Sequence, residues 1–235
     1  MASRIREGGL NLIFDADDTL WDSNIHFLEA EADFRAALAL AGVIDERAIR
    51  AALRCHELKI IESHGYGRRA YLIALHRAAQ ELAPAHEHAA LRTAVEEIGS
   101  RLVGRPCALL AGVGETLAEL RGRHRLLLFT KGDHEEQLGK LGRSGLGPLF
   151  SRVGVPIEKE PATYRLLIAQ AELDPERSYM IGNSPRSDIN AALAAGLGAV
   201  YIPHPHTWEM EHAEIDYGHA RVSTLASFRN LVEVF

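Results

Sequence analysis

The feature that most constrains the fold is an alternation of short apolar runs and amphipathic segments that begins near residue 112. Short strands that alternate with helices are typical of a parallel sheet covered by helices on both faces. We therefore predict a three-layer α/β domain. The apolar runs lie at 125–130, 151–155, 178–183 and 198–203, and the helical segments at 114–122, 134–143, 161–172 and 186–195.

An apolar run at residues 10–15 belongs to the same sheet, although it lies far upstream. The chain that follows is rich in Ala, Leu, Glu and Arg, with apolar positions three and four apart and no convincing strand. A segment at 104–117 contains Gly and Pro and predicts a hinge back to the sheet. We therefore predict a core domain of residues 1–23 and 104–235, with an all-helical domain of residues 24–103 inserted after the first strand.

Composition narrows the classes of function. The 235 residues carry a formal net charge of −6, which provides no electrostatic basis for binding nucleic acid or an anionic membrane. Two cysteines are too few for a disulfide framework, and no apolar segment has the length of a signal peptide or membrane span. We expect a cytoplasmic protein without nucleic-acid or membrane partners, in which a metal, a lysine or a helix N-terminus holds any anionic substrate.

Polar side chains follow the predicted strands at their carboxyl ends, where open parallel sheets form their active sites. They comprise carboxylates, a hydroxyl, lysines and an amide, which suit phosphate chemistry with a hard cation. We expect them to face one crevice. In chain order they are Asp15 and Asp17, Thr130 and Lys131, Lys159, and Asn183 with Asp188.

The two carboxylates after the first strand have separate predicted roles. A carboxylate nucleophile divides a difficult hydrolysis into two easier steps, and we predict that Asp15 forms an aspartyl-phosphate. Asp17 is placed to protonate the leaving oxygen and then to deprotonate water. The phosphoryl oxygens are predicted to be bound by Thr130, Lys131 and Lys159.

A magnesium ion completes this scheme, because it removes the repulsion between a carboxylate and the phosphoryl oxygens. Mg²⁺ prefers oxygen ligands, of which one or two are carboxylates. The predicted ligands are Asp15, the backbone carbonyl of Asp17, Asn183 and Asp188.

These motifs resemble those of the haloacid dehalogenase-like (HAD) superfamily of hydrolases. Four segments are similar to the four family motifs and occur in the family order: FDADDTLWDS (14–23), LLLFTKGD (126–133), EKEPATY (158–164) and IGNSPRSDINAALAAGL (181–197). The resemblance implies a Rossmann-like core with strand order 5-4-1-2-3 and a mobile helical cap. One position departs from the family, because Asn183 stands where an Asp is usual, which leaves a ligating oxygen but removes one negative charge.

Several functions share this core. In a 2-haloacid dehalogenase the same Asp displaces halide from carbon, but family dehalogenases lack an acid at the position of Asp17. A phosphomutase would keep every motif, and a non-catalytic binding module would be compatible with Asn183. The leading prediction is a magnesium-dependent phosphatase, a phosphoric monoester hydrolase, acting on a small phosphorylated metabolite. No feature of the sequence identifies that metabolite or an oligomeric state.

Overall fold

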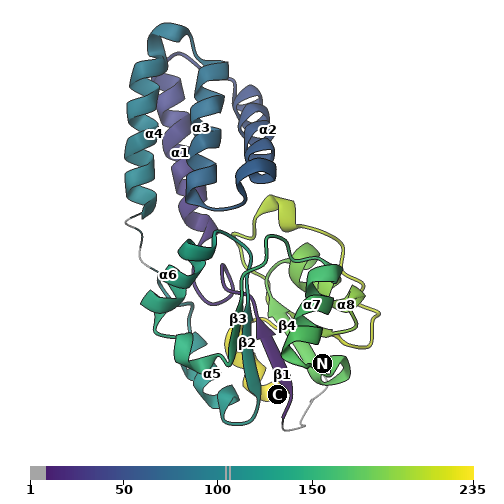
Figure 1. Ribbon diagram of the computed structural model, residues 1–235. Helices are drawn as coiled ribbons and strands as arrows, with labels where there is room; N and C mark the ends of the chain where they lie inside the picture. Colours follow the sequence, from purple (N-terminus) through teal and green to yellow (C-terminus); the bar gives the residue numbers. More distant parts are fainter. Residues whose placement is uncertain (1–8, 104, 106) are drawn as a thin grey trace. The chain divides into compact units, whose positions relative to one another are not determined.

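The computed structural model describes residues 9–103, 105 and 107–235 (Figure 1). The chain forms two compact units. One contains Met1–Asn24 and Cys107–Phe235, and the other contains Ile25–Pro106.

The larger unit is an α/β domain built on a six-stranded parallel sheet in the order β3-β2-β1-β4-β5-β6. Its first five strands confirm the predicted order 5-4-1-2-3, read from the opposite edge. The sixth strand was not predicted, because its three residues include a single apolar side chain and carry no periodicity. The strands are β1 (Asn11–Phe14), β2 (Arg125–Phe129), β3 (Arg152–Gly154), β4 (Ser178–Gly182), β5 (Gly198–Tyr201) and β6 (Val222–Thr224).

Helices cover both faces of this sheet (Figure 1). They are α5 (Val113–Arg121), α6 (His134–Ser144), α7 (Pro161–Ala171), α8 (Ala191–Ala194) and α9 (Leu231–Val234). A π-helix, η4 (Pro185–Asn190), precedes α8, and 3₁₀ helices lie at Gly147–Leu149, Pro175–Arg177, Glu209–Glu211 and Phe228–Asn230.

Two separate cores hold these layers together, because successive strand side chains point to opposite faces of a sheet. Leu12 and Phe14 of β1 join a cluster that includes residues of α5 and α9. Ile13, between them, joins a second cluster that includes residues of α7 and α8. Strands buried on both faces are continuously apolar, which is why the short runs were visible in the sequence.

The smaller unit is helical and has its own apolar core. Only residues 65–67 separate the second and third helices of this unit. Gly65 and Gly67 have φ angles of 75° and 119°, in the region that favours glycine, and this ends one helix before the next begins. The helices are α1 (Asn24–Leu40), α2 (Glu46–His64), α3 (Arg68–Leu82) and α4 (His88–Val103), with a 3₁₀ turn at Ala85–Glu87.

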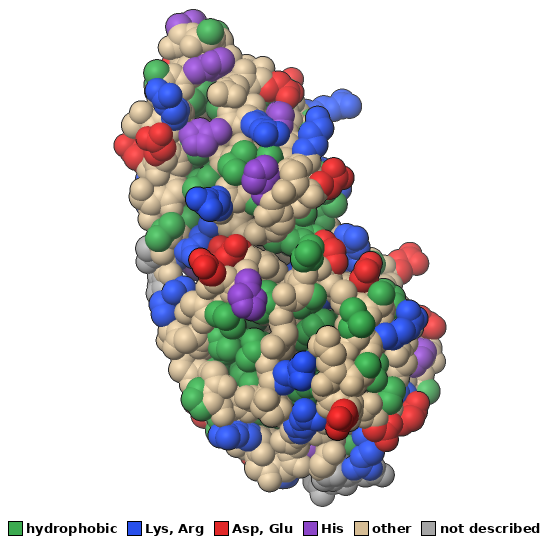
Figure 2. All heavy atoms as spheres, viewed as in Figure 1, with side chains coloured by type: hydrophobic (Ala, Val, Ile, Leu, Met, Phe, Trp, Pro, Cys, Tyr) green, Lys and Arg blue, Asp and Glu red, His purple; other side chains and the backbone are tan. Residues whose placement is uncertain are grey.

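On the face shown in Figure 2, charged side chains of both signs are interspersed over each unit. Among the described residues, no helix combines the length and the apolar character that a membrane crossing needs.

Candidate active site

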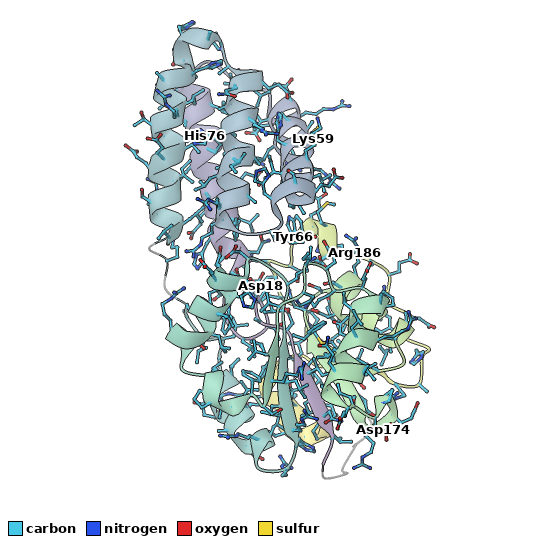
Figure 3. The ribbon with its side chains drawn as sticks, viewed as in Figure 1. Asp18, Lys59, Tyr66, His76, Asp174 and Arg186 are labelled. Atoms are coloured by element: carbon cyan, nitrogen blue, oxygen red, sulfur yellow. The ribbon has the colours of Figure 1, made fainter. Side chains whose placement is uncertain are left out.

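The candidate site is formed by loops that follow the strands of the larger unit. Asp15 to Asp18 come directly after β1, Thr130 and Lys131 after β2, and Asn183 after β4. Figure 3 shows Asp18 at one end of this unit and Asp174, which precedes β4, at the other. The predicted site residues after β1, β2 and β4 therefore share the carboxyl edge of the sheet.

Lys159 joins two of the predicted acids. Its ammonium donates to Oδ1 of Asp15 at 2.5 Å and also to Oδ1 of Asp188. The three side chains are 2%, 7% and 0% exposed, respectively, so this is a buried cluster of two carboxylates and one cation. Residues that are distant in the sequence are thus brought together in one buried cluster.

Burial governs the ionisation of this cluster. It raises the pKa of Asp15, an effect that Lys159 opposes. Burial and the charge of Asp15 together raise the pKa of Asp188 to about 7. Burial disfavours the ammonium of Lys159, but the two carboxylates outweigh it and hold its pKa well above the usual range. Two carboxylates with one ammonium leave an excess of negative charge when all three are ionised, which favours an additional cation.

The local backbone fixes Asp188. The π-helix places it one turn after Ser184, whose backbone N–H donates to its Oδ2 at 2.9 Å. Gly182 makes room for the carboxylate, since a Cβ at that position would lie 2.2 Å from Oδ2. The Ser184 side chain makes no capping hydrogen bond at the start of this π-helix.

Thr19 connects the nucleophile candidate to Asn183. Its hydroxyl oxygen lies 3.3 Å from Oδ2 of Asp15 and 3.2 Å from Oδ1 of Asn183. The amide nitrogen of Asn183 donates to Oγ1 of Thr207 at 2.9 Å, which turns the amide oxygen toward Thr19. Oxygen atoms of Asp15, Asn183 and Asp188 therefore converge on one buried region.

Asp17 has different partners. Its Oδ1 accepts from the indole N–H of Trp21 at 2.7 Å, and its Oδ2 accepts from Nε2 of Gln137 at 2.8 Å. The ammonium of Lys140 lies 2.9 Å from both oxygens. Burial acts to raise the pKa of Asp17, but Lys140 above all, with Gln137 and Trp21, lowers it overall.

The two candidate phosphate ligands after β2 differ in their surroundings. Thr130 is buried, and its backbone N–H donates to the carbonyl of Gly154 at 3.1 Å. Lys131 pairs with the buried Glu211 and lies 3.7 Å from Glu158. The structure places Lys131 in this ion-pair network, whereas Lys159 lies in the carboxylate cluster.

A second polar group involves Asp18, Asp22 and His204, whose candidate ligand atoms all lie within 4.8 Å of one another. Asp18 has a φ of 59° and accepts from the backbone N–H groups of Ser23, at 2.8 Å, and Asn24. Burial and the nearby Asp17 raise its pKa to about 7, despite these hydrogen bonds. Asp18 therefore fixes the loop that follows β1.

No role was predicted for Thr19, Gln137, Lys140 or Glu211. Thr19 lies in the first of the four motif segments, FDADDTLWDS, and was visible on that ground. Gln137 and Lys140 are three residues apart on α6 and so share a face of this helix. A polar residue on the core-facing side of an amphipathic helix was the available signal. Glu211 lies in an irregular segment without any periodicity.

Comparison with known proteins identifies the family. A model of the haloacid dehalogenase-like hydrolases matches residues 11–196. The crystal structure of a haloacid dehalogenase-like family hydrolase from Xanthomonas campestris is 32% identical, with a TM-score of 0.82, and the match covers 95% of this chain and 93% of that one. A HAD-hydrolase of Bacillus subtilis, YfnB, in a structure bound to magnesium, is 18% identical, with a TM-score of 0.61 and coverage of 97% and 99%.

Among curated proteins, a phosphoserine phosphatase of Thermus thermophilus is 34% identical over 92 residues, which are 37% of this chain and 37% of the relative. That match therefore spans little more than a third of the relative's length. The family model, in contrast, extends from β1 to the end of the fourth motif and includes every strand-end residue described above. The chain belongs to the haloacid dehalogenase-like hydrolases.

Proposed function

We propose that this hydrolase is a magnesium-dependent phosphatase that forms an aspartyl-phosphate on Asp15 and acts on a small phosphorylated metabolite. The observation that carries the proposal is the buried contact of Asp15 with Lys159, beside Asp188 and Asn183. A nucleophilic carboxylate, a fixed cation and convergent oxygen ligands suit phosphoryl transfer.

The side chains present fit a magnesium ion. Asp15, Asn183 and Asp188 supply oxygen atoms, the ligand type that Mg²⁺ prefers, and the backbone carbonyl of Asp17 is the fourth proposed ligand. The orientation of the Asn183 amide supports this, because its oxygen faces Thr19 and Asp15. When bound, Mg²⁺ supplies charge neutralisation for the phosphoryl oxygens. The magnesium-bound relative from Bacillus subtilis supports the same metal.

The protein side chains carry the following steps. A carboxylate oxygen of Asp15 attacks phosphorus, while Asp17 gives a proton to the leaving oxygen as the ester bond breaks. A water molecule then transfers a proton to Asp17 and attacks phosphorus, which releases phosphate and restores Asp15. Thr130, Lys131 and Lys159 are the proposed ligands of the phosphoryl oxygens, and the ammonium of Lys159 contacts Asp15 directly.

Asp17 favours phosphate hydrolysis over dehalogenation. Displacement of halide from carbon needs no proton on the leaving group, so a second acid has no task in that reaction. The phosphoserine phosphatase relative also supports a phosphate ester as substrate. We propose that the helical insertion, residues 24–103, is the cap that selects the metabolite.

The test is hydrolysis of p-nitrophenyl phosphate with and without Mg²⁺, for the wild type and Asp15→Asn. We expect release of nitrophenolate that requires Mg²⁺ and is lost in Asp15→Asn. Glu62→Gln, an exposed carboxylate on α2, is the matched control and should behave as the wild type. Metal-independent turnover, or full turnover by Asp15→Asn, would contradict the proposal.

A further inference from the structure

The most heavily coordinated side chain of the candidate site is Asp17, which receives donors from two parts of the chain. Trp21 comes from the loop that follows β1, whereas Gln137 and Lys140 come from α6. A carboxylate offers about four lone-pair sites. The Trp21 and Gln137 hydrogen bonds and the two contacts of Lys140 fill all four sites while Asp17 is ionised, so Asp17 takes a proton on an oxygen from which Lys140 has withdrawn one of its two contacts.

Lys140 is the donor that reaches both carboxylate oxygens, each at 2.9 Å. Its side chain is only 13% exposed, although lysine normally extends into water. Its ammonium also lies 3.4 Å from Oγ of Ser23 and 3.5 Å from the Glu136 carboxylate. Ser23 and Glu136 therefore hold the cation over Asp17, in a partly buried setting where such a contact restricts orientation.

The helix that carries Lys140 is itself fixed to the loop after β2. Asp133 caps α6 by accepting from the backbone N–H of Glu136 at 2.9 Å. Gln137 donates both to Asp17 and to the carbonyl of Lys131, at 2.8 and 3.1 Å. The first turns of α6 thus connect the proposed phosphate-binding loop with the proposed acid.

We propose that Lys140, with Gln137, is a positioning residue that orients the Asp17 carboxyl group for proton transfer. The inference rests on the proposed function and adds to it a determinant outside the four sequence motifs. When the ester bond breaks, the proton on Asp17 goes to the leaving oxygen. When water attacks the aspartyl-phosphate, its proton returns to Asp17. Lys140 itself touches neither phosphorus nor the leaving group and exchanges no proton.

Leaving groups of different acidity test this role. Nitrophenolate departs without a proton at neutral pH, whereas phenolate benefits from one, and the two aryl phosphates are otherwise alike. The ratio kcat/KM reports the step in which the ester bond breaks. For Lys140→Met we expect kcat/KM to fall about tenfold with phenyl phosphate and less than about twofold with p-nitrophenyl phosphate, within the range of general acid catalysis. Lys140→Arg, which keeps the charge and donors, should restore most of the loss.

Arg143→Met is the matched control, because it removes an exposed cation from the same helix. It should leave both substrates unaffected. Gln137→Ala removes a second anchor of Asp17 and should show the same bias as Lys140→Met, which keeps the test informative if the Met variant does not fold.

The outcomes separate the two proposals. An equal loss with both substrates in folded Lys140→Met and Gln137→Ala, or no loss with either, would show that Lys140 serves stability alone and overturn the inference. Magnesium-dependent turnover by the wild type would still support the proposed function. Absence of turnover by the wild type would overturn both.

Discussion

The ammonium of Lys159 donates to Oδ1 of Asp15 at 2.5 Å, and both side chains are almost completely buried. A buried ion is costly unless it is paired, so each of these groups depends on the other. The same ammonium also contacts Asp188, and its removal would leave two carboxylates in a low-dielectric environment.

Replacement of Lys159 by Met should therefore reduce both stability and activity. We expect the free energy of unfolding to fall by about 3–5 kcal/mol, the usual cost of removing one partner of a buried ion pair. Urea titration measures this loss. Lys59→Met, which removes an exposed lysine of α2 (Figure 3), is the control and should change stability by less than about 0.5 kcal/mol. Equal stability of the two variants would contradict the ion-pair account.

Replacement of Asn183 by Asp tests the proposed metal site. The added charge should lower the Mg²⁺ concentration that gives half-maximal activity, because Mg²⁺ binds carboxylate oxygen more strongly than amide oxygen. The Thr207 hydroxyl can reverse its hydrogen bond, since it donates as well as accepts. Magnesium titration of the hydrolysis rate measures the shift. An unchanged requirement for Mg²⁺ would place the metal away from residue 183.

Replacement of Gly182 by Ala tests how Asp188 is held. The new Cβ would lie 2.2 Å from Oδ2 of Asp188, so the carboxylate must move. We expect a destabilisation of about 1–3 kcal/mol and a loss of magnesium-dependent activity. Gly114→Ala in α5, where an added Cβ meets no atom from outside its own helix turn within 4 Å, is the control and should stabilise the chain by about 0.5–1 kcal/mol. Thermal unfolding measures the stability of both variants. Equal shifts in Tm for Gly182→Ala and Gly114→Ala would contradict close packing of Asp188 against Gly182.

Much of this site followed from local patterns. The strands β1, β2 and β4 were visible because each contributes side chains to two cores, and Asp15, Asp17 and Asn183 lie within three residues of strand ends. Contacts across long sequence separations were not visible. Lys140 reaches Asp17 over 123 residues, and Lys131 pairs with Glu211, in a segment without periodicity. Such contacts depend on side-chain orientation, which strand and helix patterns do not specify.

The helical unit should show its own pH dependence through Glu57. Burial, and then the charge of Glu31, raise the pKa of Glu57 to about 7, with Arg54 opposing them. A raised pKa means that the folded chain retains a proton that the unfolded chain releases. The stabilising contribution is therefore complete below the ordinary pKa of 4.5 and is lost as pH rises to about 7.

Glu57→Gln removes this titration. At pH 8 the variant should be more stable than the wild type by about 1–3 kcal/mol, which allows for screening of the partly exposed Glu57 carboxylate by solvent. Near pH 4.5 the two proteins should be equally stable. Urea unfolding at both pH values measures the difference. Glu62→Gln, at an exposed position of the same helix, should show no such divergence, and a gain by Glu57→Gln at low pH only would refute the account.

We propose that a phosphoryl group is transferred to Asp15, and trapping the phosphorylated Asp15 is the most direct test of that proposal. With p-nitrophenyl phosphate the first step needs no acid, whereas the second needs Asp17 to activate water. Asp17→Asn should therefore accumulate the intermediate in the presence of Mg²⁺. After acid quenching, mass spectrometry should find the mass of one phosphoryl group on the peptide that contains Asp15. Release of nitrophenolate without any phosphorylated Asp15, and with activity retained by Asp15→Asn, would contradict the account.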